Sequence, residues 1–208
     1  MTSPIIISVE GSVGAGKSTL LEKLQQQGHI VVPEPVEAWI NFEGVNPLEM
    51  LYQNPLRWSF TFQIHVLQTR IKALCDALAL HPGASVIFVE RSVQADYQVF
   101  VEYALEIGNI TPMEAAIHKE LHKMIQAYVP STDAHVYLDV SPEECLRRTK
   151  QRGRDGEEAI QDSMYHALKN KHDTWLNQTS VPTLTVCDND TLSVSRILSF
   201  ATSITNKR

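Results

Sequence analysis

Short runs of consecutive apolar residues alternate along the chain with longer segments that have helical periodicity. The apolar runs are residues 4–10, 29–32, 85–90, 135–140 and 182–186. Because they show little alternation of apolar and polar positions, they are typical of parallel strands covered by helices on both faces. The helix-like segments are residues near 18–27, 57–80, 93–106, 111–127, 142–151, 158–176 and 192–205. This order predicts an α/β protein with a parallel sheet.

Capping residues mark the ends of several predicted helices. Gly28 and Gly108 follow helical segments where C-terminal caps are expected, and Ser141 before Pro142 favours a helix start. No repeat, low-complexity tract or linker interrupts the sequence, so we expect one domain over residues 1–208. Ligands of such folds bind at the carboxyl ends of the strands, so the residues that come directly after each strand are the first candidates for a site.

The composition favours a globular protein of the cytoplasm. Hydrophobic residues make up 43% of the chain, and no apolar run approaches the roughly 18 residues of a membrane helix. The first residues, MTSPIIISVEG, have no basic region before the apolar run, which argues against a leader peptide. Cys75, Cys145 and Cys187 lack metal-ligand spacing, so we expect reduced thiols.

The charge distribution has one local exception to an acidic average. A net charge of −6 argues against general binding of nucleic acid. Residues 147–154, RRTKQRGR, nevertheless carry five basic residues in eight. Such a run is most often a solvated face or a nucleic-acid patch, so another function has to be supported by neighbouring motifs.

The residues between the first strand and the first helix match the pattern G-x-x-x-x-G-K-[ST]. Glycines let this loop curl until its backbone N–H groups face a phosphate, and the following helix adds its positive end. Lys17 adds a point charge, and Ser18 adds a hydroxyl ligand for magnesium. The strand–loop–helix context predicts a nucleotide-binding P-loop made of Gly11, Ser12, Val13, Gly14, Ala15, Gly16, Lys17, Ser18 and Thr19.

Another pattern taken alone favours a GTPase. Residues 170–173, NKHD, match the guanine-binding N-K-x-D motif. In GTPases this motif follows a strand, whereas Met164, Leu168 and Trp175 place it within a helical pattern. No D-x-x-G sequence follows the third predicted strand. We therefore interpret NKHD as a solvated stretch of helix.

Charged residues stand at the ends of the second and third predicted strands. Glu34 lies between two prolines that hold the backbone extended. A carboxylate fixed there suits a general base. From this stretch alone, it is equally good to interpret Glu34 as a turn residue whose carboxylate is hydrogen-bonded by water. Glu90 can hold a magnesium-bound water, and Arg91 can span an acceptor hydroxyl and a phosphoryl group. Together with the P-loop and the basic run, these residues indicate phosphoryl transfer.

One predicted helix carries polar residues on an otherwise apolar stripe. The stripe consists of Phe62, Gln63, Val66 and Arg70. Hydrogen-bonding groups on a buried face need partners. On the next predicted helix, Asp96 and Phe100 are four residues apart. We expect Phe62 and Phe100 to sandwich a flat ring whose edge Gln63, Arg70 and Asp96 read, which describes a nucleobase pocket.

The sequence resembles the deoxyribonucleoside kinases, the family that includes deoxycytidine and deoxyguanosine kinases. The matching stretches, in family order, are EGSVGAGKST, VPEPVEAW, LYQNPLRWSFTFQ, VERSVQAD, RRTKQRGR and KHDTWL. The resemblance implies a P-loop kinase fold with a five-stranded parallel sheet flanked by helices, and an arginine-rich lid at about 147–158. It also implies transfer of the γ-phosphoryl group of ATP, with Mg²⁺, to the 5′-hydroxyl of a deoxynucleoside. Family members salvage nucleosides and are usually homodimers.

The resemblance implies roles for individual residues. Glu34 is similar to the general base, Arg91 to the residue that orients the hydroxyl, and Lys17 to the residue at the β- and γ-phosphates. The matching magnesium ligands are Ser18 and Glu90. The residues that resemble the catalytic and ATP-binding lid arginines are Arg148, Arg152 and Arg154, and Asp188 aligns with the adenine-side loop. The residues that match nucleoside contacts are Trp39, Leu51, Tyr52, Phe62, Phe100 and Glu157, of which Tyr52 and Glu157 hold the sugar 3′-hydroxyl.

One position departs from the family pattern. Gly156 stands where the family usually has an acid. The sugar-binding acid is therefore either Glu157 or Glu158, and its distance from Arg154 favours Glu157.

Arg70 and Asp96 set the expected base preference. Gln63 does not discriminate, because its amide can present a donor or an acceptor. An Asp96 carboxylate held by Arg70 would accept hydrogen bonds from a base edge and occupy the room of a 5-methyl group. In the family, this pair resembles the deoxycytidine and deoxyguanosine kinases, which predicts deoxycytidine or purine deoxynucleosides over thymidine. Val66 is more similar to the broad-specificity members.

Two other functions compete with this interpretation. A nucleoside monophosphate kinase shares the P-loop and the lid, but it needs basic residues for the acceptor phosphate where this chain has Glu34 and Tyr52. A P-loop module that only senses nucleotide would give Glu34 no role and would release no ADP in response to a deoxynucleoside.

Overall fold

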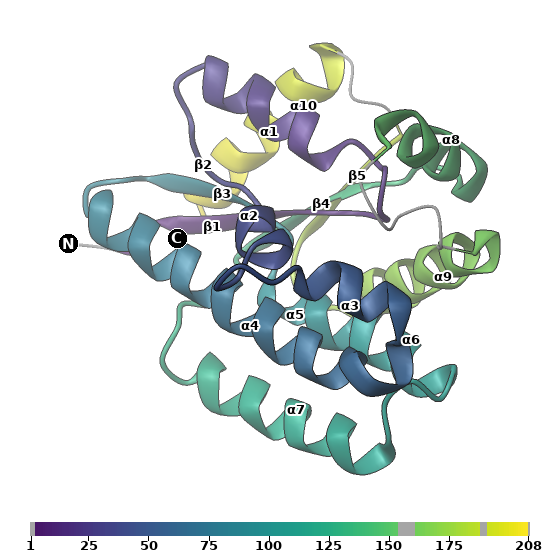
Figure 1. Ribbon diagram of the computed structural model, residues 1–208. Helices are drawn as coiled ribbons and strands as arrows, with labels where there is room; N and C mark the ends of the chain where they lie inside the picture. Colours follow the sequence, from purple (N-terminus) through teal and green to yellow (C-terminus); the bar gives the residue numbers. More distant parts are fainter. Residues whose placement is uncertain (1–2, 154–160, 188–190, 208) are drawn as a thin grey trace.

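The computed structural model describes residues 3–153, 161–187 and 191–207. In these ranges the predicted parallel sheet is confirmed, with five strands in the order β2-β3-β1-β4-β5 (Figure 1). The strands are β1 (Ile5–Glu10), β2 (Ile30–Val32), β3 (Val86–Glu90), β4 (Ala134–Leu138) and β5 (Thr183–Val186). Every neighbouring pair is parallel, so the carboxyl ends of the strands meet at one edge of the sheet.

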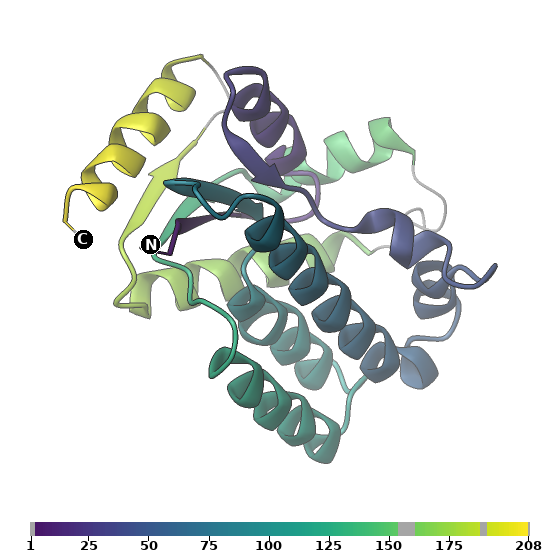
Figure 2. The same ribbon diagram turned by 90° about the vertical axis from the view of Figure 1, so that its left-hand side faces the viewer.

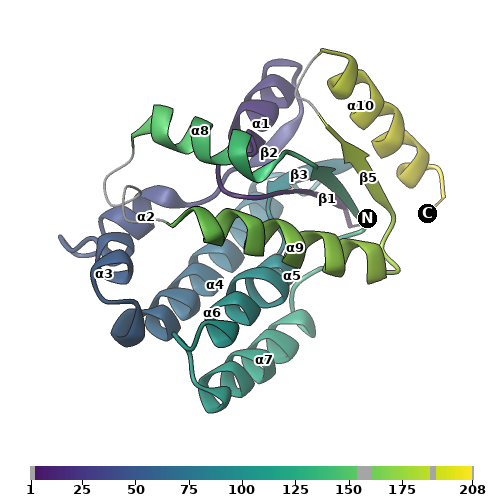
Figure 3. The same ribbon diagram turned by 90° about the vertical axis from the view of Figure 1, so that its right-hand side faces the viewer.

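Helices cover both faces of this sheet, as the apolar strands predicted. The long helices are α1 (Lys17–Gln26), α4 (Pro55–Leu80), α7 (Pro112–Gln126), α8 (Pro142–Arg152), α9 (Asp162–Gln178) and α10 (Thr191–Thr205). One face carries α1 and α10, and the other carries α4 and α9 (Figure 2, Figure 3). α7 forms an outer layer beyond α4. Among the described residues, no helix is long and apolar enough to cross a membrane.

The predicted caps are present. Gly28 and Gly108 have positive φ angles at the ends of helical segments. The Ser141 side chain accepts a hydrogen bond from the Glu144 N–H at 3.3 Å, and Pro142 is the first residue of α8.

Two short helices were not predicted, α2 (Val36–Ile40) and α3 (Pro47–Gln53). Both are too short to show a clear helical period. Two Asn-Pro pairs nevertheless mark the starts of α3 and α4. The Asn46 side chain accepts a hydrogen bond from the Glu49 N–H at 3.0 Å, and the Asn54 side chain accepts one from the Arg57 N–H at 3.2 Å. The chain therefore turns a corner before α4 and places α3 beside it.

The segment predicted as one helix over residues 93–106 has three parts, α5 (Val93–Ala95), a π-helix η1 (Asp96–Val101) and α6 (Glu102–Glu106). A π-helix bonds each N–H to the carbonyl five residues earlier, as the Glu102 N–H does with the Tyr97 carbonyl. Such turns are rare and are frequent at functional sites, and this one begins at Asp96.

The two faces of β1 differ in chemistry. Ile5, Ile7 and Val9 belong to a core cluster that includes residues of α1 and α10. On the opposite face, Ser8 and Glu10 are completely buried polar residues. Buried polar groups are expected to have hydrogen-bond partners, so this face toward α9 has a polar layer at the carboxyl edge.

The NKHD stretch lies in α9, as predicted, but our interpretation of it as solvated was wrong. His172 is completely buried, and its ring stacks on the Tyr137 ring with centroids 6.0 Å apart. Asp173 accepts a hydrogen bond from the Tyr137 hydroxyl at 2.7 Å. These residues fix α9 to β4 and leave no loop for reading guanine.

Candidate active site

The P-loop curls between β1 and α1 at the carboxyl edge of the sheet (Figure 1). Lys17 is the first residue of α1, and its ammonium donates a hydrogen bond to the Ser12 carbonyl at 3.0 Å. Its side chain is buried, and burial lowers the pKa of Lys17 to about 8, with the positive charge of Arg91 adding to the effect. The surroundings of Lys17 therefore disfavour its charged form in the free protein, which suits a group that receives phosphates.

Helix α8 packs tightly on the P-loop. A side chain at Gly14, built onto the backbone, would overlap the Cys145 carbonyl and approach the Thr149 hydroxyl to 2.6 Å. Arg148 reaches the same loop, with a hydrogen bond from Nη1 to the Ala15 carbonyl at 3.2 Å and one from Nε to Glu144 at 2.7 Å. The structure thus places one predicted lid arginine directly beside the predicted phosphate site.

Of the other residues predicted for the lid, the sugar and the adenine side, the structure describes only some. Arg152 is the last residue of α8. Arg154, Glu157 and Asp188 lie outside the described residues, as does all of the predicted lid beyond Gly153.

Ser18 and Glu90 face each other across α1 and β3. The Ser18 hydroxyl donates to the two carboxylate oxygens of Glu90 at 3.0 and 3.2 Å. Where the structure describes the chain, no group of three or more His, Cys, Asp or Glu residues is placed to hold a metal. A hydroxyl with one carboxylate still fits Mg²⁺, which is usually bound by one or two carboxylates plus phosphate oxygens and waters.

Glu34 accepts hydrogen bonds from two arginines with the same oxygen. Its Oε1 accepts from Arg91 Nη1 and, at 3.1 Å, from Arg70 Nη2. Burial alone would raise the pKa of Glu34, but Arg91 and Arg70 outweigh it and lower this pKa to about 2. Glu34 is therefore ionised at neutral pH. Its side chain is 12% exposed, so the interpretation as a turn residue satisfied by water is wrong.

Arg91 has an unusual backbone conformation. Its φ is +61°, in the left-handed region that non-glycine residues rarely adopt. Its backbone N–H donates to the Val9 carbonyl at 3.0 Å, and its Nη2 donates to the Gly11 carbonyl at 3.0 Å. The Phe100 ring lies 4.9 Å from the guanidinium carbon. Arg91 thus joins the P-loop to Glu34.

Arg70 joins Glu34 to Asp96. Its Nε lies 3.1 Å from both Asp96 carboxylate oxygens, and its Nη1 donates to the Glu90 carbonyl at 2.7 Å. Asp96 is completely buried, and burial raises the pKa of Asp96 to about 6 although Arg70 opposes the rise. The predicted pairing of Arg70 with Asp96 is present in the structure. It forms one end of a buried series of ion pairs, Asp96–Arg70–Glu34–Arg91.

The predicted pocket walls gather beside this series. Trp39, Leu48, Phe62 and Val66 form a buried cluster, against which Leu51 and Tyr52 pack. The Trp39 and Phe62 rings meet edge to face, with centroids 6.1 Å apart. Gln63 is buried one position further along α4. The sandwich of a base between Phe62 and Phe100 stays a prediction.

Sequence reasoning missed Glu10 and Ser92. Glu10 ends β1 immediately before the P-loop, and its Oε1 accepts a hydrogen bond from the Ser92 backbone N–H at 2.9 Å. A charged residue at the carboxyl end of an apolar strand was the signal that identified Glu90, and the same signal is present at Glu10.

The P-loop, the parallel sheet and the ionised groups at its carboxyl edge define the class of P-loop phosphotransferases. The model of the deoxynucleoside kinase family matches residues 7–206. The chain belongs to the deoxynucleoside kinase family. It is accordingly an ATP-dependent deoxynucleoside kinase with the P-loop kinase fold.

Several named relatives are similar over most of the chain. A probable deoxycytidine kinase, FPV151, of Fowlpox virus (strain NVSL) is 38% identical over 173 residues, which are 83% of this chain and 72% of that protein. The deoxycytidine kinase of Homo sapiens is 34% identical over 193 residues, 82% of this chain and 74% of that protein. The mitochondrial thymidine kinase 2 of Macaca fascicularis is 34% identical over 173 residues, 82% of this chain and 64% of that protein.

Proposed function

We propose that this enzyme phosphorylates the 5′-hydroxyl of deoxycytidine or of purine deoxynucleosides in preference to thymidine, for nucleotide salvage. The observation that carries the proposal is the buried series Asp96–Arg70–Glu34–Arg91. One end of the series has an acceptor suited to a base edge, and the other end adjoins the P-loop.

The residues at the P-loop supply charge for the phosphates. Lys17 and Arg148 lie at the loop itself, and we assign Arg152 and Arg154 to the same task. We assign Ser18 and Glu90 as the magnesium ligands. When held by these two residues, Mg²⁺ would supply positive charge to offset the negative charge that develops during phosphoryl transfer. Most of the catalysis in such a reaction is positioning and electrostatic stabilisation, which a fixed set of cations provides.

Glu34 is assigned as the group that receives the hydroxyl proton. Both arginine contacts use Oε1, so Oε2 is the oxygen that accepts a hydrogen bond from the 5′-hydroxyl. A carboxylate with a pKa of about 2 is a weak base. A largely dissociative transition state compensates for this, because the proton need not leave the hydroxyl before the phosphoryl group has moved. Arg91 holds the same carboxylate and orients the hydroxyl toward the phosphate.

Replacement of Glu34 tests this assignment. Glu34→Gln should lower kcat by roughly 10²–10⁴, the usual contribution of a general base, while ATP still binds. Glu37→Gln is the matched control, since it makes the same chemical change on the exposed side of α2. Near-normal turnover of Glu34→Gln would remove Glu34 from the mechanism.

Base preference is assigned to Asp96 and Arg70. The Asp96 carboxylate is held by Arg70 at both oxygens, so its position is fixed and its lone pairs are left for a base that donates hydrogen bonds. Relatives named as deoxycytidine kinases agree with this preference, while a relative named as a thymidine kinase is as similar as some of them. Overall identity therefore does not decide the base, and the pocket residues do.

A phosphorylation panel decides the substrate. Four deoxynucleosides, their ribose counterparts and the corresponding monophosphates would be compared at equal concentration. We expect deoxycytidine or a purine deoxynucleoside to be the fastest acceptor. Fastest turnover of thymidine would refute the role given to Asp96, and phosphorylation of monophosphates alone would favour a nucleotide kinase. We assign Tyr52 and Glu157 to the sugar 3′-hydroxyl, which the ribose arms of the panel probe.

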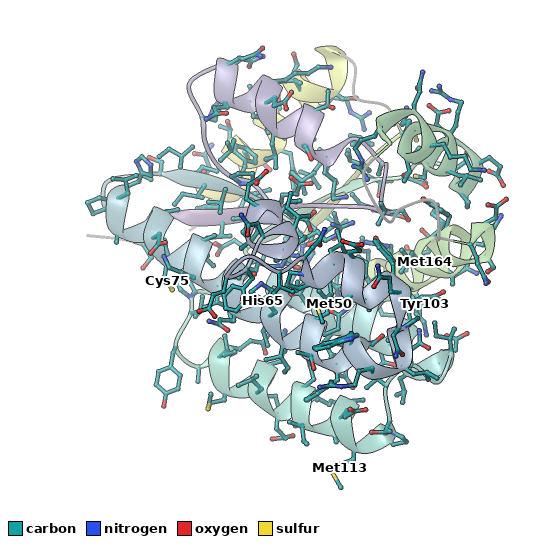
Figure 4. All side chains as sticks on the ribbon, in the orientation of Figure 1. Met50, His65, Cys75, Tyr103, Met113 and Met164 are labelled. Carbon is teal, nitrogen blue, oxygen red and sulfur yellow. The ribbon has the colours of Figure 1, made fainter. Side chains whose placement is uncertain are left out.

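We further propose a cytoplasmic homodimer that packs through α7. A stripe of exposed apolar side chains runs along this helix and just beyond it, at Met113, Ile117, Met124 and Tyr128, with 50–84% exposure. Met113 points away from the body of the protein at one end of α7 (Figure 4). Stripes of this kind mark protein–protein contacts. Ile117→Glu should give a monomer in size-exclusion chromatography with light scattering, whereas Val45→Glu, at an equally exposed loop residue, should leave a dimer.

A further inference from the structure

Glu10 is a buried carboxylate to which the proposed phosphoryl transfer gives no task. It is completely buried at the end of β1, and its Oε2 has no hydrogen-bond partner within the described chain. Burial alone would raise the pKa of Glu10, but His135 and hydrogen bonds with Ser92 and Ser8 lower it below its ordinary value. The group is therefore an ionised acid in the protein interior. Burying such a charge is unfavourable unless it is well bonded, so its presence calls for a physical reason.

The Glu10 carboxylate contacts the turn that carries Arg91. Glu10 Oε1 accepts a hydrogen bond from the Ser92 N–H at 2.9 Å, and Ser92 directly follows the left-handed Arg91. A left-handed conformation is unfavourable for a residue with a side chain, so surrounding contacts must hold it. The Arg91 N–H bonds to the Val9 carbonyl at 3.0 Å, and Glu10 holds the next N–H along.

The same turn starts α5. The Ser92 hydroxyl accepts a hydrogen bond from the Ala95 N–H at 3.2 Å and so caps that short helix. Glu10 thus binds Ser92, which lies between the end of β3 and the helical segment that contains Asp96. A hydrogen bond from an N–H to an ionised carboxylate is about twice as strong as a neutral one, which suits a turn under strain.

We propose that Glu10 is a positioning residue for Arg91. By holding the Ser92 N–H, its carboxylate keeps Arg91 left-handed, and this conformation directs the guanidinium between Glu34 and the Gly11 carbonyl. The inference rests on the role proposed for Arg91 in orienting the hydroxyl. Without the carboxylate, the turn relaxes toward an ordinary φ, and the guanidinium leaves Glu34 and the P-loop.

Three substitutions of Glu10 separate this role from a contribution to stability. Glu10→Ala removes the acceptor, Glu10→Asp withdraws it by one methylene, and Glu10→Gln keeps a neutral acceptor at the same reach. We expect kcat of the Ala and Asp variants to fall about 10- to 100-fold, as misplacement of a catalytic group by about 1 Å does. The KM for ATP should change by less than about threefold, because Lys17 stays at the P-loop although Arg91 leaves it. Glu10→Gln should restore most of kcat.

A double-mutant cycle with Arg91→Ala gives the decisive measurement. If Glu10 acts through Arg91, Glu10→Asp should cause little further loss of kcat in the Arg91→Ala background. An equal loss in both backgrounds, or unchanged kcat in Glu10→Ala and Glu10→Asp, would overturn the inference. Near-normal kcat of Arg91→Ala alone would instead overturn the proposed role of Arg91 and leave the deoxynucleoside kinase activity intact.

A control variant covers loss of folding. Ser8→Ala removes a 2.7 Å hydrogen bond to His135 and the hydrogen bond of Ser8 with Glu10, and it leaves the Glu10–Ser92 bond in place. We expect this variant to lower Tm with little change in kcat. A similar fall in kcat in Ser8→Ala would show that any disturbance of the layer is sufficient, and would also overturn the inference. If Glu10→Ala does not fold, Glu10→Asp carries the test.

Discussion

Lys17 makes ATP binding sensitive to mildly alkaline pH. Its pKa of about 8 lies below the ordinary value of 10.5, because burial and the nearby Arg91 charge disfavour the ammonium form. That difference in pKa corresponds to a free-energy cost of about 3 kcal/mol for keeping Lys17 charged in the free protein at neutral pH. Bound phosphates supply the missing counterion, so the charged form of Lys17 is the one that binds ATP strongly.

The size of the effect is set by the titration of Lys17. In the free protein, Lys17 is about 90% charged at pH 7 and about 10% charged at pH 9 for a pKa of about 8. Since the pKa is lowered, the proton is lost as pH rises through 8, and affinity is full below this value. The association constant for ATP should therefore fall about tenfold between pH 7 and pH 9, or about 1.4 kcal/mol.

Isothermal titration calorimetry at pH 7, 8 and 9 measures both consequences. The association constants give the dependence of ATP affinity on pH. Repeating the titrations in buffers of different ionisation enthalpy measures how many protons ATP binding takes up above pH 8. Lys17→Arg is the control, because a guanidinium stays charged throughout and should flatten the slope whatever its absolute affinity. A flat wild-type profile, or the same tenfold fall in Lys17→Arg, would refute the assignment of this titration to Lys17.

Three further variants test other parts of the structure. Gly14→Ala should lower Tm and weaken ATP binding at least tenfold, because its methyl group would overlap the Cys145 carbonyl and because residue 14 has a φ of +80°. Unchanged ATP affinity would contradict the packing of α8 on the P-loop. Arg70→Met combined with Asp96→Ala should admit thymidine, and an unaltered substrate panel would dismiss the pocket assignment. Thr111→Ala removes the capping box of α7 and should lower the free energy of unfolding by about 1 kcal/mol with kcat unchanged, as denaturant titration and steady-state kinetics would show.

The sequence was most informative where a local pattern determines the backbone. The P-loop glycines and the apolar strands were recognisable because each imposes its own conformation, independent of distant residues. The pairing of Arg70 with Asp96 was also accessible, since a buried polar residue on a helix must find a partner. The identity of that partner was suggested by the place of Asp96 on the next predicted helix and by the resemblance to the deoxyribonucleoside kinases.

Other features depend on contacts that no local pattern encodes. The bifurcated bonding of Glu34 Oε1 requires β2, β3 and α4 to converge, and it sets a pKa that the sequence does not contain. The need for glycine at position 14 comes from α8, more than a hundred residues later. His172 was misjudged as solvated because a polar stretch of helix gave no sign that its ring would stack under β4.

Because residues Asp96–Val101 form a π-helix, the geometry of the pocket depends on the number of residues in this segment. This stretch holds one residue more than an α-helix of the same rise. Deleting one residue, such as the exposed Gln98, would restore α-helical bonding and leave Asp96 and Phe100 three residues apart in place of four. Asp96 and Phe100 would then face in new relative directions although neither had been replaced. Nucleoside selectivity in this fold can therefore be altered by inserting or deleting one residue, a change of geometry that single substitutions do not produce.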